Sequence, residues 1–110
     1  MTDAVRSRIE QSIRSNKITL FMKGMPEFPQ CGFSARAVNC LDHVGARFTA
    51  IDVLADPEIR EGIKEYTSWP TIPQLYIDGE FVGGSDIVQD MLRSGELEKR
   101  VRQVGAVRAD

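Results

Sequence analysis

The chain has 110 residues, of which 42% are hydrophobic and 27% charged, and its formal net charge is -2. A chain of this length buries its apolar side chains in one core, so we expect a single α/β or α+β domain. Acidic and basic residues are mixed along the whole length and no run of about 18 apolar residues occurs, so we expect no nucleic-acid partner and no membrane association.

Three elements are predicted in the first half of the chain. An apolar residue recurs every four positions from Val5 to Ile13 among polar neighbours, which predicts an amphipathic helix. The apolar run KITLFMKG, residues 17–24, has the length and composition of a strand. A second helix should begin near Cys31, after a proline that cannot sit inside it, and should end at Gly45.

A second strand and a third helix are predicted next. RFTAIDV, residues 47–53, alternates in the way that a strand does. In ADPEIREGIKEY, residues 55–66, Asp56 is the expected N-cap and Pro57 the first helical residue. A strand, a helix and a strand in this order imply a right-handed crossover, so the first two strands should pair in parallel.

An antiparallel pair of strands and two further helical segments complete the predicted pattern. In QLYIDGEFVGG, residues 74–84, the pair Asp78-Gly79 is a strong signal for a two-residue hairpin turn. Helical spacing returns over residues 87–92 and again over residues 96–104.

These elements predict one α/β domain over residues 1–110, with a four-stranded mixed sheet flanked by helices. The core is expected to span about residues 5–104. The tail, residues 105–110, is expected to fray.

Both cysteines of the chain, Cys31 and Cys40, lie in the stretch FPQCGFSARAVNC. Nine residues along one helix correspond to about 13 Å of rise and roughly 180° of rotation, so the two side chains should point to opposite sides. A disulfide requires Cα atoms within about 7 Å of each other. The spacing therefore excludes an internal dithiol, and Cys40 is expected to be a thiol of the core.

Cys31 is the candidate reactive residue. It is expected at the N-terminus of the second helix, where unpaired backbone N–H groups and the helix dipole favour a negative charge. A thiolate formed there attacks disulfides or binds iron. The alternative is an inert buried cysteine, which the flanking Pro29, Gly32 and Ser34 disfavour. Gly32 leaves room beside the sulfur, and Phe33 can pack against it or shield it.

Three motifs follow one another along the predicted elements: FMKG at residues 21–24, CGFS at 31–34 and WPTIPQLYIDGEFVGGSDI at 69–87. Together they resemble the monothiol glutaredoxins of the Cys-Gly-Phe-Ser type. The resemblance runs from about Val5 to about Val104. It implies the thioredoxin-like fold of the glutaredoxins, with a single catalytic cysteine.

The resemblance also implies a binding site for glutathione next to Cys31. Glutathione is a tripeptide with two carboxylates and a thiol, so its site needs cations or N–H donors on either side of the reactive sulfur. The resemblance places Lys23 and Arg60 at the glycyl carboxylate. It places the N–H groups of Ser85 and Asp86 at the γ-glutamyl carboxylate. The expected contacts are Lys23, Arg60, Thr71, Ile72, Pro73, Gly84, Ser85 and Asp86, with Gly32, Phe33 and Ser34 in supporting positions.

Some of these residues also have ordinary explanations. Lys23 and Arg60 can be solvated surface charges, and Ser85 can be a helix cap and nothing more. Trp69 can belong to the core or shape the rim of the site.

The second proline of WPTIP, Pro73, is expected to follow a cis peptide bond in this fold. Such a bond turns the backbone of Ile72 outward, where it can pair with the backbone of the tripeptide. The Asp86 side chain can take the γ-glutamyl ammonium group.

A [2Fe-2S] cluster is the further cofactor that the resemblance implies, and such a cluster is normally held by four thiolates. One protomer offers Cys31, so two protomers and two glutathione molecules complete the set, and the cluster bridges a homodimer. Relatives of this type are thought to pass the cluster to apo iron–sulfur acceptor proteins and to pair with BolA-like proteins. The expected function is iron–sulfur cluster transfer and assembly, and iron homeostasis.

Two other functions remain open. One is a glutathione-dependent thiol–disulfide oxidoreductase, in which the Cys31 thiolate attacks a mixed disulfide and a second glutathione resolves it. Its activity is expected to be weak beside the carrier role. The other is an adaptor that binds a partner without needing Cys31.

The N-terminal segment suggests where the protein works. Residues 1–17 lack the apolar core of a signal peptide, and Asp3 and Glu10 argue against an organelle transit peptide. Two cysteines without secretory context fit a reducing compartment. We expect a cytoplasmic protein, mainly because the chain begins at Met1 without a presequence.

Overall fold

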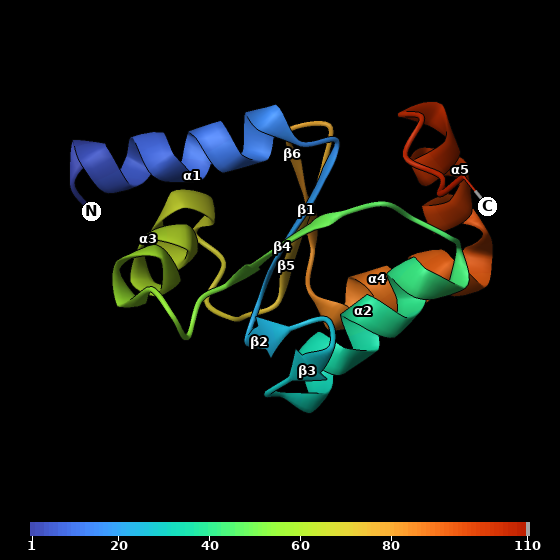
Figure 1. Cartoon of the computed structure of the whole chain (residues 1–110), viewed down its shortest axis with the longest axis horizontal. Helices are drawn as coiled ribbons and strands as arrows, with labels where there is room; N and C mark the ends of the chain where they lie inside the picture. The colour runs from blue at the N-terminus through green and yellow to red at the C-terminus, as the bar shows by residue number, and fades with distance from the viewer. Residues whose placement is uncertain (110) are drawn as a thin grey trace.

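A four-stranded mixed sheet with helices on both faces organises the chain (Figure 1). The computed structural model describes residues 1–109. Its elements, in chain order, are α1 (Asp3–Ser15), β1 (Ile18–Met22), β2 (Gly24–Met25), β3 (Phe28–Pro29), α2 (Gly32–His43), β4 (Thr49–Asp52), α3 (Pro57–Thr67), β5 (Gln74–Ile77), β6 (Glu80–Gly83), α4 (Ser85–Ser94) and α5 (Glu96–Gln103). The predicted four-stranded mixed sheet flanked by helices is confirmed.

The strand order in the sheet is β4-β1-β5-β6. Strand β1 pairs in parallel with β4, as the predicted crossover requires, and antiparallel with β5. In the predicted hairpin of β5 and β6, φ is 53° at Asp78 and 80° at Gly79, as a two-residue turn of this kind requires. These directions bring the residues after β1, after β4 and before β5 together at one edge of the sheet.

The helices bury two apolar cores, one on each face of the sheet. Helices α1 and α3 lie on one face, and α2 and α4 lie on the other (Figure 1). The first core contains Val5, Ile9, Ile13, Phe21, Val53, Ile59, Ile63, Ile72 and Tyr76. The second includes Leu20, Met22, Val38, Cys40, Leu41, Leu75, Val88, Leu97 and Val101. Strand β1 supplies side chains to both cores because successive strand residues point to opposite faces.

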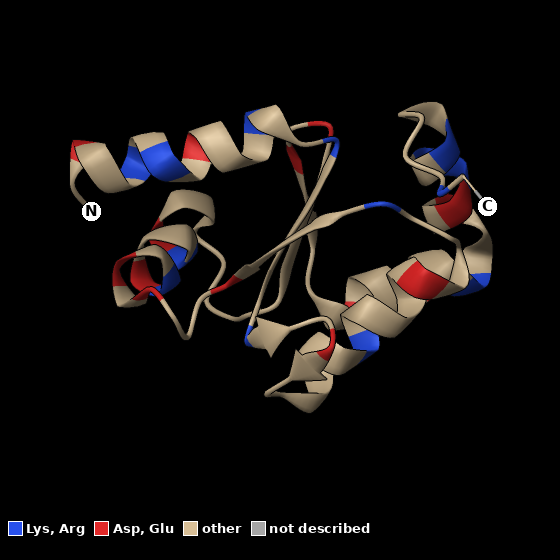
Figure 2. Cartoon of the chain, in the orientation of Figure 1, with Lys and Arg blue, Asp and Glu red and all other residues tan. Residues whose placement is uncertain are grey.

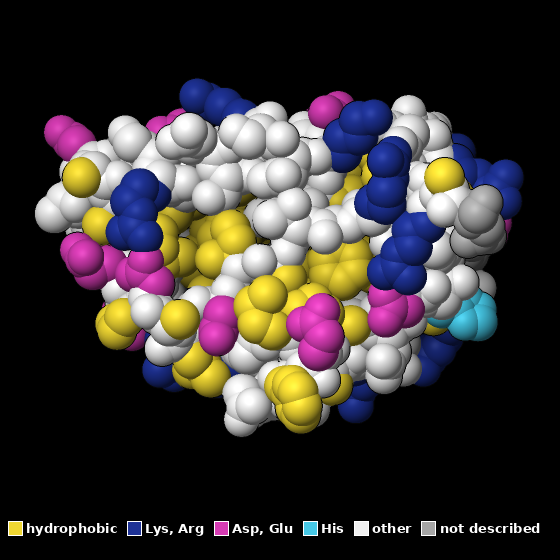
Figure 3. Space-filling model, viewed as in Figure 1, with side chains coloured by type: hydrophobic (Ala, Val, Ile, Leu, Met, Phe, Trp, Pro, Cys, Tyr) yellow, Lys and Arg dark blue, Asp and Glu magenta, His cyan; other side chains and the backbone are white. Residues whose placement is uncertain are grey.

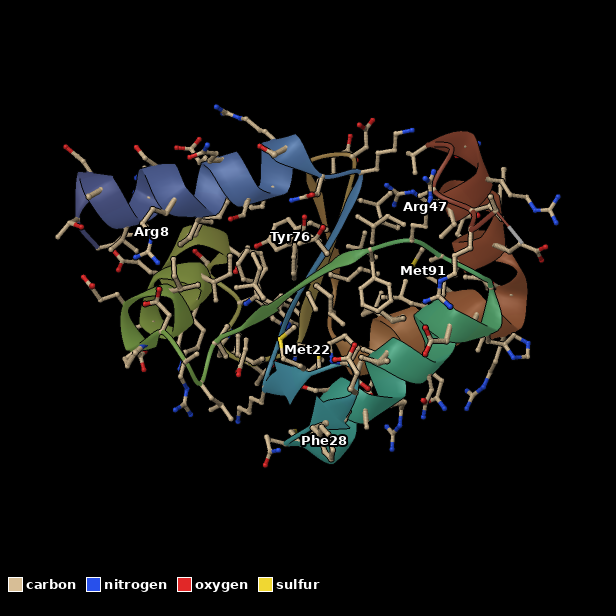
Figure 4. All side chains as sticks on the ribbon, in the orientation of Figure 1. Arg8, Met22, Phe28, Arg47, Tyr76 and Met91 are labelled. Atoms are coloured by element: carbon tan, nitrogen blue, oxygen red, sulfur yellow. The ribbon has the colours of Figure 1, made fainter. Side chains whose placement is uncertain are left out.

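The predicted N-cap of α3 is confirmed. Asp56 Oδ1 accepts a hydrogen bond from the backbone N–H of Ile59 at 3.2 Å, and Pro57 is the first helical residue. The Asp56 carboxylate also pairs with Arg8 of α1 (Figure 4). This guanidinium is the main cause that holds the pKa of Asp56 below its ordinary value. The contact joins α1 to α3 on the outer face of the molecule.

A hairpin of β2 and β3, which we did not expect from the sequence, precedes α2. Gly24 has a φ of 86°, and a Cβ at this position would lie 2.5 Å from the carbonyl oxygen of Phe28. Only glycine fits both the left-handed backbone and this close approach. The hairpin directs Phe28 outward, away from the sheet (Figure 4).

The expectation that residues 105–110 fray is wrong for the part of the tail that the structure describes. Ala106 is buried, and its carbonyl accepts a hydrogen bond from the N–H of Arg47 at 2.6 Å. The N–H of Arg108 donates to the carbonyl of Gly45 at 2.7 Å. The tail thus forms an antiparallel bridge to the loop after α2, a partner far away in the sequence. The last residue lies outside the described part.

Charged residues of both signs are spread over the helices (Figure 2). Several form exposed ion pairs within one helix, such as Arg14 with Glu10 at 3.0 Å and Arg102 with Glu98 at 2.9 Å. Each exposed pair contributes little to stability. Over residues 1–109, no helix combines the length and the apolar character needed to cross a bilayer.

Removal of residues 105–110 should lower the free energy of unfolding by about 1–3 kcal/mol, measured by urea denaturation with circular dichroism. Backbone groups of Gly45 and Arg47 lose their partners, and Ala106 leaves the core. As a control, Arg102→Ala removes only an exposed pair and should change this free energy by less than about 0.5 kcal/mol. An unchanged free energy in the truncated chain would contradict the docked tail.

Candidate functional site

Cys31 lies at the N-cap of α2, as predicted, and is partly exposed. The backbone N–H of Ser34, directed at the sulfur, is the largest cause that holds the pKa of the Cys31 thiol below its ordinary value. Partial burial opposes this effect, whereas the N–H of Phe33, the charge of Lys23 and the Ser34 hydroxyl add to the lowering of the pKa. The thiolate is therefore favoured, as suits a nucleophile or a metal ligand.

Ser34 stands where a dithiol motif has its second cysteine, and it is completely buried. Its Oγ accepts a hydrogen bond from the backbone N–H of Lys23 at 3.1 Å. The carbonyl of Lys23 accepts a hydrogen bond from the N–H of Gln30 at 2.9 Å. The first turn of α2 and the segment before Cys31 are thus tied to the end of β1. Ser34 is a structural anchor of the site as well as a replacement for a resolving thiol.

Asp52, at the end of β4, fixes the backbone of Gly24, the residue after Lys23. Its Oδ1 accepts hydrogen bonds from the N–H of Gly24 and from the N–H of Leu54, both at 2.9 Å. The backbone around Lys23 is therefore held from two sides, by Ser34 and by Asp52. Asp52 gave no signal in the sequence, because its role depends on a contact with a distant strand end.

Three cations line a hollow next to Cys31. Lys23 comes from the end of β1, and Arg60 and Lys64 come from α3. Cys31 itself, Phe33, Pro70, Thr71 and Ile72 complete the lining. The Nε of Arg60 is buried and has no hydrogen-bond partner within residues 1–109. This hollow suits a carboxylate.

Lys64 was not among the predicted site residues. It follows Arg60 by four positions, which places both cations on one face of α3. This spacing is the signal in the sequence that could have identified Lys64.

Phe33 also borders a second hollow, at the N-terminus of α4. The hollow is lined by Phe33, Trp69, Thr71, Ile72, Pro73, Gly84, Ser85, Asp86 and Ile87. Gly84 is the N-cap of α4 and no side chain caps this helix, so none competes for its first N–H groups. The alternative in which Ser85 caps the helix is wrong, because Ser85 is the first helical residue. Its buried Oγ has no partner among the described residues.

The segment WPTIP, between α3 and β5, contributes to the walls of both hollows. The Ile72–Pro73 peptide bond is cis, as predicted. Gln74 holds the segment from beneath: it is completely buried, and its Nε2 donates to the carbonyls of Trp69 at 3.1 Å and Thr71 at 3.2 Å. Trp69 lines the rim of the second hollow, and its buried Nε1 has no partner in the described chain.

All eight residues predicted to contact glutathione line at least one of the two hollows, and Thr71 and Ile72 line both. A Cβ at Gly84 would lie 3.4 Å from the carbonyl oxygen of Pro73 and 3.5 Å from Trp69 Nε1, which is ordinary van der Waals contact. Gly32 is exposed, and a Cβ there would meet nothing within 4 Å. Contact of these residues with a ligand stays a prediction.

Cys40 is a core thiol, as predicted. It is buried in the core beneath α2, and this burial raises the pKa of its thiol. Both cysteines are free. Within residues 1–109, no group of three or more His, Cys, Asp or Glu side chains could hold a metal ion.

The chain is similar to known proteins over most of its length. The glutaredoxin family matches residues 18–82. Monothiol glutaredoxin-5, mitochondrial, of Saccharomyces cerevisiae is 49% identical over 110 residues, which cover 97% of this chain and 73% of the yeast protein. The solution structure of reduced apo GrxS14 from poplar has a TM-score of 0.80 at 47% identity and covers 94% of each chain. A buckwheat glutaredoxin–glutathione complex has a TM-score of 0.86 at 25% identity and covers 98% of this chain and 100% of the buckwheat chain.

These similarities confirm the thioredoxin-like fold that the sequence predicted. Nearly half of the aligned residues are identical between this chain and the poplar and yeast relatives, and the alignments cover almost the whole of this chain. The chain belongs to the glutaredoxin family and, within it, to the monothiol glutaredoxins.

Proposed function

We propose that this monothiol glutaredoxin binds a [2Fe-2S] cluster together with glutathione at the interface of a homodimer, and that it passes the cluster to apo iron–sulfur acceptor proteins. The observation that carries the proposal is one favoured thiolate, Cys31, in the wall of a hollow that adjoins a second one through Phe33, Thr71 and Ile72, and both hollows suit anions. One hollow is cationic and the other lies at an uncapped helix N-terminus. A ligand with a carboxylate at each end fits this arrangement.

Glutathione has the required ends. Its glycyl carboxylate suits the cations of the first hollow, and its γ-glutamyl carboxylate suits the N–H groups of α4. Three buried polar atoms without a partner among residues 1–109 belong to residues that line the hollows: Arg60 Nε, Trp69 Nε1 and Ser85 Oγ. Buried polar atoms normally have partners, so these three support a polar ligand. A tripeptide that joins both hollows brings its own thiol close to Cys31.

A second thiolate beside Cys31 changes what the site can hold. Four thiolates normally ligate a [2Fe-2S] cluster, and Cys31 with one glutathione supplies two of them. Two protomers supply all four, with the cluster as cargo between them. A ligand set that includes a dissociable tripeptide suits cluster transfer and iron homeostasis better than permanent electron transfer.

The surface around Cys31 supports contact with a second protomer. Met25, Phe28 and Phe33 are 43%, 77% and 55% exposed and lie within a few residues of the thiol. Hydrophobic side chains reach the surface at the lower edge of Figure 3, where Figure 4 labels Phe28. Exposed apolar side chains that gather in this way favour an interaction surface. We propose that a BolA-like partner and the acceptor proteins bind the same surface, and that they do so in the cytoplasm.

A second candidate function, glutathione-dependent reduction of mixed disulfides, is favoured by the lowered pKa of Cys31. The Cys31 thiolate attacks the glutathione sulfur of a mixed disulfide, and the thiolate of the other partner leaves. A second glutathione thiolate then attacks the Cys31–glutathione disulfide, which releases glutathione disulfide and restores the Cys31 thiolate. Because Ser34 replaces a second cysteine, resolution depends on free glutathione.

Anaerobic reconstitution with iron, sulfide and glutathione should give a coloured dimer that carries one [2Fe-2S] cluster, seen by visible absorption and by mass. Cys31→Ser should remain a colourless monomer because it loses the protein ligand. Cys40→Ser is the matched control, since it removes the core thiol and should still bind the cluster. A colourless wild-type monomer with robust turnover of a glutathionylated substrate would favour the oxidoreductase instead.

The alkylation rate of Cys31 should rise with pH through a midpoint below the ordinary pKa of a cysteine thiol, because the folded protein favours the thiolate. Mass spectrometry with iodoacetamide, in the Cys40→Ser background, measures this midpoint. Lys23→Met should move it upward, since the charge of Lys23 lowers the pKa of Cys31. A midpoint at or above the ordinary value would contradict the favoured thiolate.

Loss of a cation from the first hollow should weaken glutathione binding. Lys64→Gln is expected to raise the dissociation constant by about threefold to tenfold, as for a partly exposed charge-assisted contact. Calorimetric titration in the Cys31→Ser background measures binding without thiol chemistry. Lys99→Gln, on the exposed side of α5, is the matched control and should have no effect. Equal affinities for both variants would remove Lys64 from the site.

A further inference from the structure

Arg36 of α2 reaches across to the first turn of α4. Its guanidinium carbon lies 5.6 Å from the centroid of the Phe33 ring, and its Nη1 lies 3.7 Å from Oδ1 of Asp86. Both charged side chains are accessible, with 44% of Arg36 and 88% of Asp86 exposed. Phe33 and Asp86 both line the second hollow, so the guanidinium lies at its edge.

The second hollow contains groups that favour an anion close to a group that favours a cation. The uncapped N–H groups of α4 and the buried, unpartnered Oγ of Ser85 suit an anion. The carboxylate of Asp86 suits a cation. A ligand end that carries a carboxylate and an ammonium group on the same carbon satisfies both preferences at once.

We infer that Arg36 is a specificity-determining residue that recognises the α-carboxylate of such an amino-acid end. In the free protein its guanidinium pairs with Asp86. When the ammonium group of the ligand takes Asp86, the guanidinium is released within reach of the neighbouring carboxylate. This inference rests on the proposed binding of glutathione, whose γ-glutamyl end has this chemistry.

The exchange of partners is favourable because of how Arg36 is held. The accessible ion pair between Arg36 and Asp86, at 3.7 Å, contributes little free energy to the free protein. Breaking it on binding therefore costs little free energy. The Phe33 ring restricts the guanidinium in both states, which reduces the loss of side-chain freedom when the carboxylate arrives. The new partner lies against a hollow whose walls include Trp69 and Ile72, and its contact with the guanidinium is charge-assisted on both sides.

Calorimetric titration of two ligands tests the assignment, in the Cys31→Ser background so that no disulfide forms. One ligand is glutathione, and the other is 4-aminobutanoyl-cysteinyl-glycine, which keeps the ammonium group and lacks the α-carboxylate. Arg36→Met should raise the dissociation constant for glutathione by about threefold to tenfold and leave that of the analogue within about twofold. Arg93→Met, at the far end of α4, is the matched control and should change neither constant.

Three results would overturn the inference. Unchanged glutathione affinity in Arg36→Met would mean that the guanidinium does not reach the carboxylate, and tighter binding would mean that Arg36 only competes for Asp86. An equal loss for both ligands would mean that Arg36 acts as a general charge. Failure of the proposed function is distinguishable, since the protein with Arg36 intact would then show no calorimetric binding of glutathione.

Discussion

The hydrogen bond from the Lys23 backbone N–H to the buried Ser34 hydroxyl is the contact on which the site depends. It fixes the first turn of α2 against the end of the central strand, and so places the Cys31 sulfur relative to the cation that follows this strand. A thiol in place of this hydroxyl would be a weaker acceptor. One residue therefore removes the resolving thiol and at the same time stabilises the position of the thiolate that remains.

Local chemistry made much of the fold predictable. The N-cap at Asp56 and the hairpin turn at Asp78-Gly79 depend on residues next to each other in the sequence, and both are confirmed. The hairpin of β2 and β3 could not be predicted in this way, because two-residue strands carry no periodicity and a distant carboxylate, Asp52, holds the N–H of Gly24. The contacts of the tail from residue 105 onward could not be predicted for the same reason, because its partners lie in the loop after α2, far away in the sequence.

The residues of the site also differ in whether they could be predicted from the sequence. Cys31 could be predicted from its helix N-terminus and Pro73 from the resemblance, and the structure confirms the N-cap position of the cysteine and the cis bond before the proline. Gln74 and Arg36 could not, because each is an ordinary polar residue until the fold supplies its partners. Lys64 is intermediate between these cases: its spacing from Arg60 was visible, but only the placement of α3 against the end of β1 makes that face a wall of the site.

Both hollows hold their polar groups in place before any ligand arrives. The N–H groups of α4 are fixed by the helix, and the WPTIP segment is fixed by the amide of Gln74. A site whose donors are already oriented loses little conformational entropy on binding, which offsets the weakness of its exposed charges. The same rigidity keeps the position of a bound tripeptide constant, and with it the distance between the tripeptide thiol and Cys31. Under the proposed function, one reactive cysteine and the tripeptide thiol would form a defined pair of thiolates, which a cluster held between two copies requires.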